Sequence, residues 1–251
     1  MSAQLPLTLR WPAHQRFEAF AAGDNGVALD LLQRAASEPS QAALYLSGAP
    51  GSGRTHLLIA TCAAANAAGR SAQYLPLATL SANADGAIRA FGGSALLAID
   101  DVDAIAGSGA AEHALFDLYN RCRAEGASLV FAASAPPSQI GIALPDLVSR
   151  LGACTQIALK PLGEAERRVL LRSRAAARGI DLDESVLDWL FAREKRDLGS
   201  LLAMLDRVDA ASLAAQRRVT VPFLRKLLES SAAFPPSRAV FPLSRLRERV
   251  G

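Results

Sequence analysis

The chain has 251 residues, of which 51% are hydrophobic and 20% are charged, so it can bury a substantial core in one large domain or in one domain with a small addition. It contains no apolar run of the roughly 18 residues that a membrane crossing needs, and its first residues do not resemble a secretion signal. Three scattered cysteines and three histidines show no disulfide or metal-ligand spacing. The sequence therefore predicts a soluble cytoplasmic protein with no membrane partner.

The net charge of +3 at pH 7 comes from the C-terminal tail. Residues 231–251 hold four arginines and one glutamate, which leaves 23 basic and 23 acidic side chains in the rest of the chain. Domains that bind nucleic acid directly usually present a basic surface. An electroneutral body gives no support to direct DNA binding. The tail contains several prolines and no clear period, and we expect it to be disordered.

Strands and helices are expected to alternate through residues 17–160, after a polar arm at 1–16. We expect helices over 27–36, 55–68 and 112–125, and strands over 43–46, 71–75, 95–99, 128–132 and 155–159. The run at 95–99 is entirely apolar, which is typical of a strand buried on both faces. This alternation predicts an α/β domain in which helices sandwich a parallel sheet.

The pattern changes after Pro161, where only helical periodicity is found. We expect helices over 163–178, 183–193, 197–214 and 221–228, and no strand. The chain is therefore divided into an arm at 1–16, an α/β domain at 17–160, a small all-helical subdomain at 161–230 and a tail at 231–251.

A glycine-rich segment, GAPGSGRTH at 48–56, lies between the first expected strand and the helix after it. At every position but one it follows the pattern G-x-x-x-x-G-K-[ST], whose backbone N–H groups surround phosphate oxygens at a helix N-terminus. A chance glycine-rich turn is the alternative, but the flanking strand and helix argue against it. The expected nucleotide-binding residues are Gly48, Pro50, Gly51, Ser52, Gly53, Arg54, Thr55 and His56, with the Thr55 hydroxyl also offered to Mg²⁺.

Arg54 stands where the pattern has lysine. The chain has only three lysines, so a general preference for arginine is one explanation. The two side chains differ at a phosphate, because lysine is a compact point charge and arginine a wide planar fork. We expect nucleotide binding to survive this change and hydrolysis to suffer, because placement of a transition state tolerates less displacement.

Two carboxylates, Asp100 and Asp101, end the apolar strand at 95–99. Ligands of open α/β sheets bind at this carboxyl edge. Asp100 would hold Mg²⁺ through its water shell, and Asp101 would polarise an attacking water. A solvated turn is the alternative interpretation. Asp103 is expected to be an ordinary surface residue.

Further segments follow in a fixed order: FDLYNR at 116–121, ALPDLVSRL at 143–151, REKRDLGSLLAMLDRVD at 193–209 and RRVTVPFLRKLL at 217–228. Together with GAPGSGRTH and with LLAIDDVD at 96–103, they resemble the DnaA-related AAA+ family over about residues 4–229. Within that family the chain is most similar to the shortened Hda type, the regulatory inactivators of the replication initiator. The resemblance implies an AAA+ P-loop domain followed by a helical lid.

Three residues gain roles only from this resemblance. Arg150 falls where the family carries its arginine finger, which would act in trans on a neighbour's nucleotide. Arg196 matches the sensor arginine of the lid, which would contact the chain's own nucleotide. Ser134 lies where the first sensor is usually acidic, and this departure argues against sensing of the γ-phosphate. Without the resemblance, Arg150 and Arg196 would be ordinary surface charges.

The arm contains Gln4, Leu5, Leu7 and Leu9 in the segment QLPLTL, which resembles a hexapeptide that docks on the bacterial sliding clamp. Gln4 could hydrogen-bond at the rim of a pocket while the leucines fill an apolar groove in extended form. A frayed apolar terminus is the equal alternative. The initiator's C-terminal DNA-binding domain is not expected after residue 228.

The resemblance implies a negative regulator of replication initiation. It would bind ADP, with ATP as a second option, together with Mg²⁺, and it would have little ATPase activity of its own. Its partners would be the initiator DnaA and the DNA polymerase III sliding clamp, with DNA contacted only through the clamp; a homodimer is left open. The alternative is a self-assembling AAA+ ATPase that loads a helicase or remodels DNA, and a third hypothesis is a scaffold that no longer binds nucleotide.

Overall fold

A computed structural model of the chain describes residues 11–12, 15–39, 42–80, 84–193, 198–215 and 222. The chain forms two compact units that divide between Glu166 and Arg167, and each is described by itself. Several predictions fall outside the described residues and stay predictions: the helix over 221–228, apart from residue 222, the lid arginine Arg196, the tail 231–251, and the arm residues Gln4, Leu5, Leu7 and Leu9.

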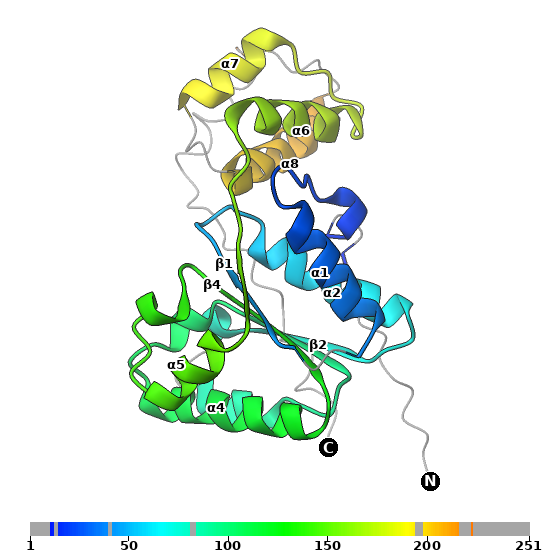
Figure 1. Ribbon diagram of the computed structural model, residues 1–251. Coiled ribbons are helices and arrows are strands. Elements are labelled where there is room, and N and C mark those ends of the chain that lie inside the picture. The colour runs from blue at the N-terminus through cyan, green and yellow to red at the C-terminus, as the bar shows by residue number, and fades with distance from the viewer. Residues whose placement is uncertain are drawn as a thin grey trace, which may run out of the picture. The chain divides into compact units, whose positions relative to one another are not determined.

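The first unit is built on a five-stranded sheet in the order β2-β3-β4-β1-β5, and every neighbouring pair is parallel (Figure 1). The expected strands are confirmed to within one residue at each end. Their bounds are β1 (Leu44–Ser47), β2 (Ala72–Pro76), β3 (Leu96–Asp100), β4 (Ser128–Ala133) and β5 (Thr155–Ala158). The parallel order brings the carboxyl ends of β1, β3 and β4 to one edge of the sheet.

Helices cover both faces of this sheet (Figure 1). The three expected ones are confirmed as α1 (Gly26–Ser37), α2 (Arg54–Ala67) and α4 (Gly109–Ala124). Two further helices, α3 (Ala84–Ala90) and α5 (Pro145–Gly152), were not predicted from the sequence. With seven and eight residues, these two are too short to establish a helical period by themselves. Short 3₁₀ turns complete the unit: η1 (Phe17–Ala19), η2 (Leu77–Thr79), η3 (Val102–Ile105) and η4 (Pro137–Gln139).

The strands alternate their side chains between two cores. Leu96 and Ala98 of β3 pack with α1 and α2, while Leu97 and Ile99 pack with α3, α4 and α5. All four side chains are at most 1% exposed, as expected of a strand buried on both faces. The sheet therefore holds β3, and the carboxylates at its end, between two apolar layers.

The second unit contains α6 (Glu164–Ala176) from Arg167 onward, together with α7 (Glu184–Arg193) and α8 (Leu198–Ala215). These confirm three of the expected helices. No strand occurs in its described part. These helices share an apolar core that includes Leu171, Leu187, Phe191 and Leu205. None of the helices in the described parts of the chain combines the length and the apolar character that crossing a bilayer requires.

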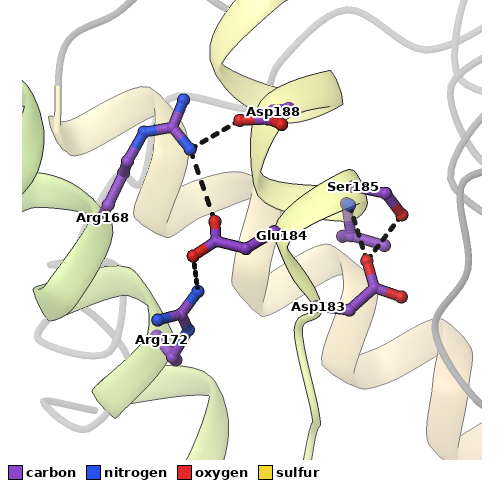
Figure 2. Close-up of polar contacts among 7 residues, drawn as sticks. Arg168, Arg172, Asp183, Glu184, Ser185 and Asp188 are labelled. Carbon is purple, nitrogen blue, oxygen red and sulfur yellow. Dashed lines mark hydrogen bonds and ion pairs between the residues drawn. The ribbon is translucent and has the colours of Figure 1, made fainter.

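Polar contacts join α6 to α7 at the surface of the second unit (Figure 2). Arg168 lies 2.7 Å from Asp188 and 3.7 Å from Glu184, and its guanidinium also lies over the ring of Phe191 at 4.8 Å. Arg172 lies 2.7 Å from the other oxygen of Glu184. Such a network orders a helix pair better than isolated exposed ion pairs do.

The beginning of α7 is capped by the residue before it (Figure 2). Asp183 accepts hydrogen bonds from the Ser185 hydroxyl at 2.6 Å and from the Val186 backbone N–H at 2.9 Å. These bonds lower the pKa of Asp183, the Ser185 bond most, because they favour the charged carboxylate.

Candidate functional site

The phosphate loop connects the end of β1 to the start of α2, as the motif requires. Gly51 and Gly53 have φ angles of 81° and 94°, a region that residues with a side chain rarely adopt. Space is restricted as well, because a Cβ on Gly53 would lie 2.5 Å from Cε2 of Phe20. A Cβ on Gly48 would lie 2.5 Å from the Ser52 hydroxyl oxygen. The glycines are therefore needed both for the turn and for the close packing around it.

Two buried polar atoms of this loop have no hydrogen-bond partner among the described residues: Oγ of Ser52 and Nη1 of Arg54. Buried donors are almost always paired, because an unsatisfied one costs about 1–3 kcal/mol. The Arg54 side chain is only 12% exposed. Donors of this kind at a helix N-terminus fit an anion with several oxygens, such as a nucleotide phosphate.

Asp100 ends β3 with both of its carboxylate oxygens engaged. Oδ2 accepts hydrogen bonds from the Thr55 hydroxyl at 2.6 Å and from the Tyr74 hydroxyl at 2.8 Å, and Oδ1 accepts one from the Asp101 N–H at 3.0 Å. Burial, together with the Asp100 charge, raises the pKa of Tyr74, so this phenol stays a donor at neutral pH. Thr55 and Asp100 therefore place two oxygens side by side, which is the ligand chemistry that Mg²⁺ prefers.

Asp101 follows with a left-handed backbone, at φ 53°. Its Oδ1 lies 3.7 Å from Nη2 of Arg54, so the arginine of the phosphate loop pairs with the second carboxylate of the strand end. Burial and the neighbouring Asp100 raise the pKa of Asp101 and outweigh the opposite effect of Arg54. Arg54 and Asp101, which belong to separate sequence motifs, thus form an ion pair.

Asp103, expected to be an ordinary surface residue, makes contacts that the sequence did not predict. Asp103 is half-buried, and it accepts hydrogen bonds from the backbone N–H of Ser134 at 3.2 Å and from the Ser134 hydroxyl at 2.8 Å. It also lies close enough to Asp101 to contribute to the raised pKa of that group. Ser134, which directly follows β4, is not acidic itself. Asp103 nevertheless places a carboxylate there, because it accepts the hydrogen bonds of Ser134.

His56 lies in the first turn of α2, but its side chain contacts the segment before α1. Its Nε2 donates to the carbonyl oxygen of Arg16 at 2.9 Å, and its ring centroid lies 5.3 Å from that of Phe20. Phe20 also packs against Gly53, as described above. His56 therefore connects residues 16–20 to the phosphate loop, and its Nε2 is used by this connection.

Arg150 lies in α5, away from the contacts that join the phosphate loop to β3. It is exposed, and no hydrogen bond or ion pair joins its guanidinium to another described residue. Leu147 and Leu151 of the same helix are completely buried. α5 therefore has one apolar face against the core, and Arg150, one turn after Leu147, lies exposed at the edge of that face.

Three residues of this site were not predicted from the sequence: Phe20, Tyr74 and Asp103, which pairs with Ser134. Tyr74 lies on β2, next to β3 in the sheet, and in register with Ala98. Tyr74 lies two residues before the end of β2. This position could have identified it only if the sequence had shown that β2 is the neighbour of β3. Phe20 and Asp103 make their contacts across long chain separations, and no local pattern marks them.

Family comparisons agree with this arrangement. The model of the bacterial DnaA ATPase domain matches residues 12–158, which is more than half of the chain. The chain belongs to the DnaA-related AAA+ family. The model of the Hda lid domain matches residues 164–228, so the AAA+ domain is followed by a lid of the Hda type.

Solved structures show the same AAA+ fold. Domain III of the Thermotoga maritima replication initiation protein DnaA matches with a TM-score of 0.72 and 20% identity, over 88% of this chain and 98% of that one. A replication initiator DnaA bound to AMPPCP and single-stranded DNA matches with a TM-score of 0.68 and 18% identity, over 88% and 70%. The Thermotoga maritima RuvB Holliday junction branch migration motor matches at 0.62 and 16%, over 86% and 72%.

Proposed function

We propose that this member of the DnaA-related family is a nucleotide-binding regulator of replication initiation. In this proposal it binds ADP with Mg²⁺, is tethered to the sliding clamp, and stimulates hydrolysis of the ATP held by DnaA. The observation that carries the proposal is the position of Arg150: its guanidinium is exposed and has no ion pair or hydrogen bond among the described residues, while Leu147 and Leu151 of the same helix are buried. The match to the Hda lid model supports the same assignment.

The nucleotide would be held by the phosphate loop. The unpartnered Oγ of Ser52 and Nη1 of Arg54 fit a phosphate group, and the adjacent Thr55 and Asp100 oxygens fit Mg²⁺. A solved DnaA relative is bound to AMPPCP, which agrees with an adenine nucleotide here. When bound, the nucleotide supplies negative charge that neutralises the loop, and the chain's own residues orient it. Arg196 stays a proposed contact from the lid.

Weak intrinsic hydrolysis follows from the contact between Arg54 and Asp101. An attacking water needs a free carboxylate beside it, and this carboxylate lies 3.7 Å from a guanidinium of the same chain. Burial and the neighbouring Asp100 raise the pKa of Asp101, so its charged form is disfavoured in these surroundings. In the proposed function Asp101 therefore does little chemistry on the chain's own nucleotide, and Arg150 acts on the nucleotide of the partner.

An arginine finger stabilises charge that develops on the γ-phosphate in the transition state, an effect of about 10³–10⁵ in rate. A guanidinium engaged with carboxylates of its own chain would have to break these contacts first. Arg150 has no such contact among the described residues, so its transfer to a partner's site costs little within this chain. The finger would leave ADP binding by this chain unchanged.

Clamp tethering rests on the segment QLPLTL in the arm, which lies outside the described residues. A few buried anchors usually carry most of the binding energy of such a peptide. We expect the double variant Gln4→Ala, Leu5→Ala to lose binding to immobilised sliding clamp, measured by surface plasmon resonance. Its thermal midpoint and ADP affinity should equal those of the wild type. Undiminished clamp binding would remove the arm from the proposal.

The decisive experiment reconstitutes ATP-loaded DnaA with clamp-loaded DNA and the purified chain, and follows conversion of the DnaA-bound ATP to ADP. We expect conversion only when the chain and the clamp are both present. A steady-state ATPase assay of the chain alone decides against the alternative. Intrinsic turnover near about 1 per second, the lower end of ordinary enzymes, would favour a self-assembling ATPase, and absence of bound nucleotide would favour a scaffold.

A further inference from the structure

Glu112 is a buried carboxylate that the site described above does not use. It lies in the first turn of α4, its residue is 1% exposed, and it has no cation as a partner among the described residues. It accepts hydrogen bonds from three backbone N–H groups instead: Gly107 at 2.8 Å, Ala143 at 3.0 Å and Leu144 at 2.8 Å. Buried acids are rare, and one that is held by backbone donors alone fixes the segments that provide them.

The two segments held by Glu112 are adjacent in the chain to residues that have roles in the proposed function. Gly107 follows η3, the turn that begins directly after Asp101 and contains Asp103. Leu144 is the N-cap residue of α5, which carries Arg150. A single side chain therefore connects the loop behind the acidic strand end to the first turn of the helix with the finger.

Helix α5 has only eight residues, so a directional contact at its beginning is needed to fix its orientation. The apolar contacts of Leu147 and Leu151 with the core are not directional, so they allow α5 to rotate or slide. Charge-assisted hydrogen bonds to the residues at the beginning of α5 are short and directional, and a negative charge at a helix N-terminus also interacts favourably with the helix dipole. Figure 1 shows α4 and α5 side by side on the same face of the sheet.

We infer that Glu112 is the positioning residue for the arginine finger: its carboxylate orients α5 through Ala143 and Leu144, and thereby sets where Arg150 lies. This inference rests on the proposed role of Arg150. Displacement of a catalytic group by about 1 Å can cost 10²-fold in rate. Glu112 would therefore affect stimulated hydrolysis without contacting nucleotide, DnaA or Arg150 itself.

The variant that tests this is Glu112→Gln, which keeps the shape but replaces one acceptor oxygen by an N–H₂ group that faces backbone donors. A matched control is Arg70→Met, because the half-buried Arg70 also joins distant segments of the first unit through side-chain hydrogen bonds. It donates five hydrogen bonds that do not involve α5, to the carbonyl oxygens of Ala35, Ala36, Glu38 and Ala95 and to the hydroxyl of Ser128.

The first measurement needs no partner. Hydrogen exchange of the full chain should show faster exchange, by about tenfold or more, for the amides of Ala143, Leu144 and α5 in Glu112→Gln. The amides of α2 and β1 should keep their protection. Arg70→Met should lower the thermal midpoint without this local effect. Unchanged exchange in α5 of Glu112→Gln would overturn the inference, whatever the function of the chain.

The second measurement is a double-mutant cycle on stimulated ATP hydrolysis by DnaA. Glu112→Gln should lower the maximal rate by about tenfold or more and leave the half-saturating concentration within about twofold. Combined with Arg150→Ala it should add no further loss, because it acts through that residue. Additive losses would overturn the inference. If the wild type gives no stimulation, the proposed function fails, and faster exchange in α5 would then support only the anchoring of this helix.

Discussion

The arginine of the phosphate loop and the arginine of helix α5 lie in opposite surroundings. Arg54 is 12% exposed and lies 3.7 Å from Asp101 of its own chain, whereas Arg150 is exposed and unpaired among the described residues. The first arginine belongs to a closed set of contacts around the chain's own ligand site. The second is held in place by a buried helix face and remains available to another molecule. In the proposed function, nucleotide binding by this chain and stimulation of DnaA would therefore depend on different parts of one domain.

The largest effect is expected when the arginine of α5 is removed. We expect Arg150→Ala to lower stimulated hydrolysis of DnaA-bound ATP by about 10³-fold. ADP affinity and thermal midpoint should stay unchanged, because the side chain has no partner to lose among the described residues. The measurement is single-turnover conversion of labelled ATP on DnaA in the presence of the clamp.

Arg34→Ala is a suitable control for that experiment. Arg34 is also an exposed arginine of the first unit, and it forms a local ion pair with Asp30 on α1. Its replacement should leave stimulation unchanged. If Arg150→Ala stimulates as well as the Arg34→Ala control, then Arg150 is an ordinary surface residue and the finger lies elsewhere.

A smaller effect is expected on the phosphate-loop side. Arg54→Lys should raise intrinsic ATP turnover by about tenfold, because a lysine is a compact charge that can contact phosphate without pairing with Asp101. ADP affinity, measured by calorimetry, should change by less than about threefold. In the double variant Arg54→Lys, Asp101→Asn the gain should disappear. Equal turnover in Arg54→Lys and the wild type would show that the arginine does not restrain the carboxylate.

The smallest effect concerns the charge on Asp101. Its pKa in the folded protein is raised, so the folded protein holds this proton more tightly than the unfolded chain does. The associated stability is present below the unfolded pKa of about 3.9 and is lost as the pH rises through the folded value. Asp101→Asn should therefore raise the thermal midpoint of the nucleotide-free protein at pH 7, by roughly 1–2 °C. Asparagine also tolerates the left-handed backbone at this position.

The pH dependence is the test of this explanation. Thermal unfolding of the wild type and of Asp101→Asn is compared from pH 7 down to about pH 4, and the difference should shrink as Asp101 becomes protonated. A variant that is less stable than the wild type at pH 7 would mean that the pairing with Arg54 outweighs burial and the neighbouring carboxylates.

Local pattern was sufficient for the parts of the molecule in which adjacent residues act together. The apolar run before Asp100 predicted β3 within one residue, because a strand buried on both faces leaves no polar position. The phosphate loop was equally readable, since glycines, helix start and hydroxyl follow one another without interruption. The helical lid followed from the change of period after Pro161. These features depend on steric and hydrophobic rules that act over a few residues.

Tertiary structure alone decided which distant side chains meet. Tyr74 reaches Asp100 because β2 and β3 are neighbours, Asp103 reaches Ser134 because β4 ends beside η3, and Glu112 reaches the beginning of α5 across about thirty residues of chain. The periodicity of the sequence does not predict these contacts, because strand order and helix packing determine which side chains meet. The sequence by itself thus determined the fold class and the identity of the phosphate loop. Only packing decided that Arg54 faces Asp101 while Arg150 faces solvent, because a charge finds its partner through three-dimensional distance rather than through separation along the chain.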